Sequence, residues 1–172
     1  MRKIALVICE GETEVCYLNL LNKWYKSPIK IVSHIEGTKI TPSLVENRIK
    51  ELKISSRDKV YTFLMYDMDV EVVNEKLLKC KAEMLLSNPC FEIWLLLHIK
   101  DQKTAIKTDV LIKELKKIAP VWKNYNKSAF TDTQQSFLKD NTDVAVIRAK
   151  DLREFQNPST GIYKLIEMLK KR

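Results

Sequence analysis

Glycine, proline and histidine are scarce in this chain of 172 residues, which has three glycines, five prolines and two histidines. So little glycine and proline argues against long flexible loops and linkers. The four cysteines form no Cys-x-x-Cys pair, and with only two histidines we expect no zinc site. Two of the cysteines lie in apolar runs and look like small core residues, as in a protein of a reducing compartment. We therefore expect a cytoplasmic location.

Long hydrophobic runs are also absent. No apolar run approaches the roughly 18 residues that a membrane span needs. The apolar run at residues 4–9 follows a charged start, but no small-residue cleavage site follows it, so we expect no secretion signal. Hydrophobic residues make up 45% and charged residues 30% of the chain, a balance typical of globular proteins.

The charge is strongly basic. Lysine and arginine number 30 against 22 acidic residues, which gives a net charge of +8 and an isoelectric point near 9.2. A basic domain of this size often meets a polyanion, although charge alone supports only non-specific attraction. Solubility alone is a second explanation for the same charge.

The first half of the chain alternates apolar segments with helical patterns. Strands are predicted over residues 3–9, 29–33, 60–66 and 82–86. Helices are predicted over residues 14–25 and 70–79, and a third begins at Pro42 after the N-cap residue Thr41. Nearly continuous apolar strands that alternate with helices are typical of a mostly parallel sheet covered on both faces. We therefore predict an α/β fold with a mostly parallel four-stranded sheet flanked by helices.

The second half is predicted to be mainly helical. Asn157-Pro158 looks like the N-cap and first-turn proline of the last helix. Residues 119–141 have weak periodicity and are predicted to form a surface loop. We treat residues 1–172 as a single domain, with an α/β core over 1–98 and a mainly helical extension over 99–172. Helices are predicted over residues 91–99, 109–118, 143–155 and 161–171.

Acidic residues follow two of the predicted strands directly. Glu10 follows the first strand, and Asp67 and Asp69 follow the third. Glu14 lies four residues after Glu10, which is about one turn if a helix begins there. Ligands of open parallel sheets bind outside the carboxyl ends of the strands, and hard divalent cations prefer oxygen ligands. The sequence therefore predicts that four carboxylates converge on one edge of the sheet.

Each of these acids also has an ordinary explanation. A glutamate at a helix N-terminus interacts favourably with the helix dipole. An aspartate after a strand is a common turn former and N-cap. The hypothesis of a functional site depends on the two groups of acids occurring together.

Several motifs give the chain a resemblance to a known family. In order and spacing they resemble the signature blocks of the RloB family over almost the whole chain. The weaker blocks are Tyr125-x-Lys127 and Ala145-x-x-Arg148-Ala149. The stronger ones are Cys9-Glu10-Gly11-Glu12-Thr13-Glu14, Tyr66-Asp67-Met68-Asp69, the stretch SNPCFEIWLLLH from Ser87 to His98, and Asn157-Pro158-Ser159-Thr160.

The resemblance implies a fold and a setting. RloB-like proteins resemble Toprim-fold nucleases, including the nuclease half of OLD-type proteins, so a Toprim-like sheet is expected. They occur in bacterial restriction and abortive-infection loci, commonly beside an ABC-type ATPase. An anti-phage role and an ATPase partner are expected on that basis.

The resemblance also implies roles for individual residues in metal-dependent cleavage of DNA or RNA, tRNA included. Asp67 and Asp69 would hold one Mg²⁺ or Mn²⁺ ion, and Glu14 a second. Glu10 would ligate a metal or act as general base, so that Glu10, Asp67 and Asp69 are the catalytic set. Ser87 and Glu92 are implied to be further groups at or behind the metal site.

A nuclease also needs positive charge against the phosphate backbone. The candidates are Lys127, Arg148 and Lys150. Trp122 and Tyr125 lie near lysines in the predicted loop. They suit either stacking on unpaired bases or contact with a partner protein.

Two other functions stay open at this point. A non-catalytic subunit that binds nucleic acid or an ATPase would not need to hold Mg²⁺ or Mn²⁺. A haloacid dehalogenase-like phosphatase would use Asp67-x-Asp69 as its nucleophile motif. That motif usually follows the first strand, however, and no convincing downstream lysine and acidic pair is present.

Overall fold

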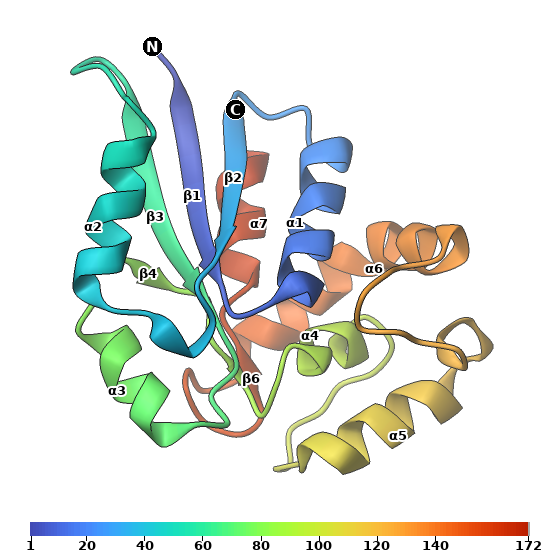
Figure 1. The fold of residues 1–172 in the computed structure, drawn as a ribbon. Coiled ribbons are helices and arrows are strands. Elements are labelled where there is room, and N and C mark those ends of the chain that lie inside the picture. Colours follow the sequence, from blue (N-terminus) through green and yellow to red (C-terminus); the bar gives the residue numbers. More distant parts are fainter. Residues whose placement is uncertain (172) are drawn as a thin grey trace.

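A sheet of four parallel strands lies at the centre of the fold, with helices on both of its faces (Figure 1). The strands β1 (Lys3–Cys9), β2 (Ile29–Ile35), β3 (Lys59–Met65) and β4 (Glu83–Met84) lie in the order β2-β1-β3-β4. The computed structural model describes residues 1–171. The predicted α/β class is confirmed, and every strand pair of this sheet is parallel.

The helices are α1 (Glu12–Trp24), α2 (Pro42–Glu51), α3 (Glu71–Leu78), α4 (Glu92–Leu97), α5 (Thr108–Ile118), α6 (Asp132–Lys150) and α7 (Tyr163–Lys170). Two short 3₁₀ turns are η1 (Gly37–Lys39) and η2 (Pro120–Trp122). A two-stranded antiparallel pair, β5 (Ser87–Asn88) with β6 (Ser159–Thr160), joins the chain after β4 to the chain before α7. Helices α1 and α7 lie on one side of the sheet, and α2 and α3 on the other (Figure 1).

The side chains of β1 contribute to two separate hydrophobic cores, one on each face of the sheet. Successive side chains of a strand point to opposite faces of the sheet. Ala5, Val7 and Cys9 therefore pack in a core that also contains residues of α1 and α7. Leu6 and Ile8 pack in a second core with residues of α2 and α3. A strand buried on both faces needs a continuous apolar run, which is why its position is easy to predict.

The helical second half joins the first of these cores. Trp94 of α4, Trp122 of η2 and Leu138 of α6 are fully buried and pack in the same core as Leu18 of α1. None of the helices in residues 1–171 combines the length and the hydropathy that a bilayer crossing requires.

Two predictions about the second half are wrong. The long helix α6 begins at Asp132, so much of the expected loop at residues 119–141 is helical. Its start is fixed by a capping box, in which Thr131 Oγ1 accepts from the N–H of Gln134 and the Gln134 side chain accepts from the N–H of Thr131. The last helix begins at Tyr163, and Asn157 is not its N-cap. The Asn157 side chain instead forms two hydrogen bonds with the backbone of Ile106. Its Oδ1 accepts from the Ile106 N–H at 3.0 Å, and its Nδ2 donates to the Ile106 carbonyl oxygen at 2.8 Å.

Candidate metal centre

The ends of β1 and β3 bring two acidic residues together. The register pairs Cys9 with Met65, the last residues of the two neighbouring strands. The N–H of Glu10 donates to the Met65 carbonyl oxygen at 3.2 Å, and the N–H of Asp67 donates to Glu10 Oε2 at 2.9 Å. These two bonds fix the Glu10 carboxylate against the backbone that carries Asp67.

The first turn of α1 adds a third carboxylate. Glu14 stands at the third position of the helix, and its Oε2 accepts from the N–H of Gly11 at 3.1 Å. This backward contact is the glutamate half of a capping box. It turns the side chain towards the sheet edge, where it is only 5% exposed. Oxygens of Glu10, Glu14 and Asp67 all lie within 4.8 Å of one another.

Burial and mutual repulsion make this cluster costly when it is fully ionised. Burial, followed by the charges of Glu10 and Glu14, raises the pKa of Asp67 to about 9. Burial, with a smaller contribution from Glu10, raises the pKa of Glu14 to about 7. The pKa of Glu10 is also raised, mainly by burial. Three converging carboxylate oxygens with raised pKa values fit a divalent cation, which would balance their charge.

Glu92 and its partners border the cluster. Glu92 is fully buried at the start of α4, and its charge contributes to the raised pKa values of Asp67 and Glu14. Its carboxylate accepts from the Tyr125 hydroxyl at 3.2 Å and lies 3.5 Å from Lys127 Nζ. Lys127 therefore brings a positive charge to the edge of an otherwise acidic site.

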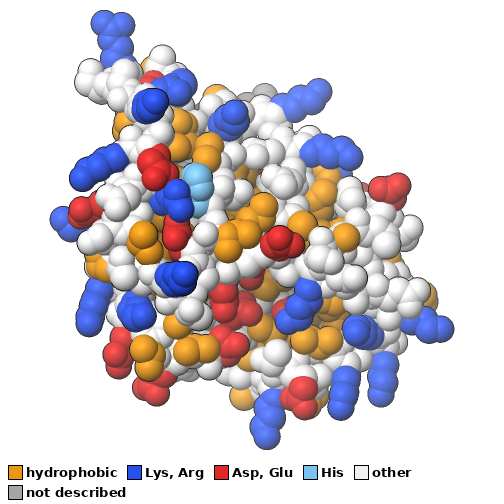
Figure 2. All heavy atoms as spheres, viewed as in Figure 1, with side chains coloured by type: hydrophobic (Ala, Val, Ile, Leu, Met, Phe, Trp, Pro, Cys, Tyr) orange, Lys and Arg blue, Asp and Glu red, His pale blue; other side chains and the backbone are white. Residues whose placement is uncertain are grey.

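Backbone contacts hold the surroundings of the site in place. The N–H of Phe91 donates to Asp67 Oδ1 at 2.7 Å. The turn that carries Lys127 is tied to α1, because the Thr13 hydroxyl donates to the Lys127 carbonyl at 2.7 Å. The Cys16 thiol likewise donates to the Ser128 carbonyl at 3.2 Å. Figure 2 shows acidic side chains gathered near the middle of this face of the molecule.

Asp69 and Ser87 do not belong to the three-carboxylate group. Asp69 is exposed, although its charge contributes to the raised pKa of Glu10. Ser87 is buried, with its Oγ 2.9 Å from Thr160 Oγ1 and its carbonyl accepting from the N–H of Met68. The structure thus brings together three of the four predicted carboxylates, and Ser87 supports the chain between the two aspartates and β6.

Two of the three basic candidates have partners elsewhere in the protein. Arg148 Nη1 donates to the Leu97 carbonyl oxygen at 2.8 Å and so joins α6 to α4. Lys150 pairs with Glu167 at 2.6 Å between α6 and α7. Of the three, Lys127 is the one that the structure places beside the acidic cluster.

Trp122 and Tyr125 do not form an exposed surface for either of the two roles that the sequence left open, base stacking or partner contact. Trp122 is fully buried and Tyr125 is 6% exposed, and both belong to the first core. Their rings pack edge to face against each other, and Trp122 also packs edge to face against Phe137. The lysines nearby are exposed, but the aromatic rings are not. The role of the Tyr125 hydroxyl as a partner of Glu92 was missed, and its only signal was the Tyr125-x-Lys127 spacing.

The fold and the site together define an α/β protein with a cluster of carboxylates at the carboxyl edge of its sheet, which could hold a metal ion. The family model described as "RloB-like protein" matches residues 5–169, nearly the whole chain. The chain therefore belongs to the RloB-like family, as its motifs indicate. No curated protein and no solved structure matches it.

Proposed function

We propose that this chain is a divalent-metal-dependent nuclease that hydrolyses phosphodiester bonds of DNA or RNA, with tRNA among its possible substrates. The observation that carries the proposal is the convergence of Glu10, Glu14 and Asp67 at the carboxyl edge of the sheet. Lys127 beside this cluster and the net charge of +8 support a polyanionic substrate.

The three carboxylates would hold Mg²⁺ or Mn²⁺, and exposed Asp69 would extend the ligand set towards solvent. When bound, such an ion lowers the pKa of water and stabilises the charge that develops on phosphate. Glu10 is oriented by the N–H of Asp67, which fits it to accept a proton from the attacking water. Asp67 is oriented in turn by the N–H of Phe91.

Lys127 would contact the negatively charged phosphate group. Its ammonium group is held by Glu92, which is itself held by the Tyr125 hydroxyl. A cation positioned before the reaction stabilises developing negative charge without reorganising during the step. Glu92 and Tyr125 are positioning residues in this scheme, because they act through Lys127.

Membership of the RloB-like family supports the wider setting of the proposal. A Toprim-like relation to OLD-type nucleases, a role in anti-phage or restriction-associated defence and an ABC-type ATPase partner are proposed on that basis. The activity would take place in the cytoplasm, where nucleic-acid substrates and such an ATPase are present.

A cleavage assay with a matched pair of variants tests the proposal. Plasmid, single-stranded DNA and total tRNA are incubated with the protein in Mg²⁺, Mn²⁺ or EDTA. Asp67→Asn removes a ligand, whereas Asp140→Asn makes the same chemical change at an exposed position of α6. We expect metal-dependent cleavage that Asp67→Asn lowers by more than about 100-fold, beyond the loss typical of a supporting group. Asp140→Asn is expected to keep full activity.

Direct binding of Mn²⁺, measured by calorimetry, separates the remaining outcomes. Mn²⁺ binding that Asp67→Asn abolishes, without cleavage, would indicate an enzyme that requires its ATPase partner. Absence of Mn²⁺ binding would support a non-catalytic binding subunit. Cleavage that persists in EDTA or in Asp67→Asn would overturn the site assignment, and hydrolysis confined to small phosphomonoesters would support a phosphatase.

A further inference from the structure

Positive charge is concentrated in one segment of the chain. Residues 100–128 contain eight lysines and three acidic residues, a net charge of +5 out of +8 for the whole protein. The segment comprises α5, the turn η2 and the loop that ends at Lys127. One sixth of the residues therefore carries more than half of the net charge.

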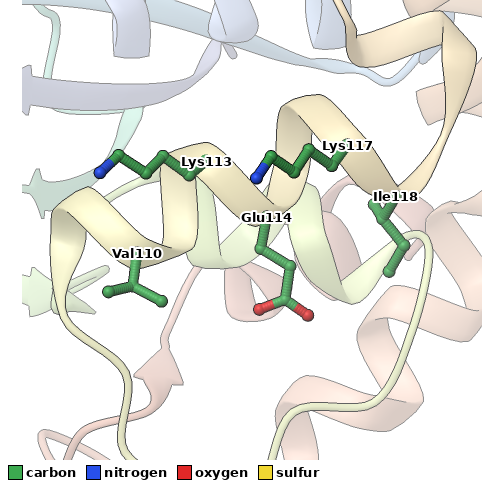
Figure 3. A pocket seen from close by; sticks show the side chains of 5 residues that line it. All are labelled: Val110, Lys113, Glu114, Lys117 and Ile118. Carbon is green, nitrogen blue, oxygen red and sulfur yellow. The ribbon is translucent and has the colours of Figure 1, made fainter.

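Three lysines of α5 form an exposed basic face. Leu111 and Leu115 are fully buried and anchor one side of the helix. At 3.6 residues per turn, Lys113, Lys116 and Lys117 lie on the opposite side. All three are exposed, and Figure 3 shows Lys113 and Lys117 extending in the same direction from the helix.

These lysines differ from several others in having no acidic partner. Lys150, Lys164 and Lys170 each form an ion pair with a nearby carboxylate. The acids of α5 are Asp109 and Glu114; Glu114 is already paired with Lys100, and within residues 1–171 Asp109 forms no ion pair with these lysines. Within residues 1–171 no ion pair involves the three lysines of the basic face, nor the exposed Lys107 and Lys123 at either end of it.

The basic face leads towards the metal centre. The turn η2 packs against α5, and Lys123 follows it directly. Four residues later Lys127 stands beside Glu92 at the acidic cluster. In Figure 2 the acidic side chains are near the middle of the face, and lysines or arginines gather at the lower right, where Figure 1 places α5. The basic face and the acidic cluster therefore lie on the same face of the molecule, and the chain from Lys123 to Lys127 connects them.

We propose that Lys113, Lys116, Lys117 and Lys123 bind the phosphate backbone of a nucleic-acid strand that enters the carboxylate cluster past Lys127. The proposal rests on the proposed nuclease function and adds the surface that holds the substrate. A protein partner fits less well, because lysine is depleted in protein–protein interfaces, whose hot spots are mostly tryptophan, tyrosine and arginine. The hollow on α5 is lined by Val110 and Ile118 together with Lys113, Glu114 and Lys117, and it presents no tryptophan, tyrosine or arginine (Figure 3).

The test compares two triple variants with the same change in charge. Lys113→Gln/Lys116→Gln/Lys117→Gln removes the basic face. Lys23→Gln/Lys26→Gln/Lys30→Gln removes three exposed lysines near the start of β2, at the opposite edge of the sheet from the carboxylates. Binding of fluorescent single-stranded DNA, single-stranded RNA and duplex oligonucleotides is titrated in EDTA at several salt concentrations, and Mn²⁺ binding is measured separately.

We expect the α5 variant to lose about tenfold or more in affinity. The slope of log K against log salt should become shallower by about 2 to 3, since each lost phosphate contact removes about 0.7 to 0.9. The control variant should keep the wild-type slope, and both should bind Mn²⁺ as the wild type does. Equal salt slopes for the two variants, or wild-type affinity of the α5 variant, would contradict nucleic-acid binding by this basic face. Either result would favour a protein partner for α5.

The outcomes also separate this surface from the proposed function. If the wild type cleaves nucleic acid and the α5 variant cleaves and binds equally well, the nuclease stands and the surface is wrong. If the α5 variant alone loses binding but no metal-dependent cleavage depends on Asp67, the surface stands and the nuclease is wrong.

Discussion

Two carboxylates of the acidic cluster, Asp67 and Glu14, make the stability of the protein depend on pH. The pKa of Asp67 is about 9 and that of Glu14 about 7 in the folded protein, against ordinary values near 4. A raised pKa means that the folded state binds the proton more tightly than the unfolded state. The stabilisation that follows is present below about pH 4 and is lost as the pH rises towards 9.

We therefore expect Asp67→Asn to be more stable than the wild type at alkaline pH when no divalent ion is present. Thermal unfolding in EDTA should show a difference in melting temperature that grows between about pH 5 and pH 9. Mn²⁺ should raise the melting temperature of the wild type at about pH 8, because a ligand of the folded state stabilises it, and should leave the variant unchanged. A wild type that stays more stable than Asp67→Asn at every pH would contradict the buried acidic cluster.

Arg148 distinguishes a packing role from a role in binding nucleic acid. Its guanidinium donates to the Leu97 carbonyl and joins α6 to the end of α4. Arg148→Ala should lower the free energy of unfolding by about 1.5 to 3 kcal/mol, the usual range for a hydrogen bond that involves a charged group. Chemical denaturation measures this change. The opposite result would be unchanged stability together with nucleic-acid binding whose dependence on salt is shallower by about one phosphate contact. It would indicate that Arg148 binds nucleic acid.

The sequence predicts the site residues that directly follow apolar strands, but not those whose contacts form between distant parts of the chain. Glu10 and Asp67 come directly after buried strands, so an apolar run followed by an acid was enough to place them at one edge. Asp69 was predicted with them, but it lies beyond the extended part of the chain and is exposed. The contact between Tyr125 and Glu92 spans 33 residues, so the Tyr125-x-Lys127 spacing marks Tyr125 but does not identify its partner.

At the scale of elements, Gly161 marks a close approach between β6 and the chain after β4. A Cβ atom at this position would lie 2.8 Å from the Met84 carbonyl oxygen and 3.2 Å from the Leu85 Cα, and both are backbone atoms. Gly161→Ala should therefore cost about 1 to 3 kcal/mol, as overpacking does. Gly11→Ala is the control, because its Cβ would meet only Glu14 Oε2 at 3.7 Å in an extended backbone. Equal denaturation midpoints for the two variants would contradict the close approach.

The elements differ in how much of their position the sequence determines locally. Strands β1 and β3 were predicted within one residue, because β1 and the second half of β3 are buried and therefore form apolar runs. The first half of α6 was missed because residues 132–141 are mostly polar, and only the capping box at Thr131 and Gln134 indicates a helix start there. Asn157-Pro158 has the local pattern of a helix start, but the Asn157 side chain is hydrogen-bonded to the backbone of Ile106 and caps no helix.

At the scale of the whole molecule, the two halves of the chain share one core and one site. Leu18 and Trp94 from residues 1–98 pack in the same core as Leu138 and Ile162 from residues 99–172. The acidic cluster also draws on both halves, since the Tyr125 hydroxyl of the second half donates to Glu92, which borders the cluster. We therefore expect the chain to unfold as a single cooperative unit, and the site to be lost together with the helical half.

Trp122→Ala tests this coupling. The ring is fully buried in the shared core, and its removal should cost about 3 to 5 kcal/mol. Fluorescence of the remaining Trp24 and Trp94 should follow the same unfolding transition as circular dichroism. Trp94 belongs to the first half of the chain but packs in the core that both halves share. Mn²⁺ binding should disappear at the same denaturant concentration. A separate early transition of the helical half, with Trp94 fluorescence and Mn²⁺ binding retained, would show instead that residues 1–98 form an independent metal-binding unit.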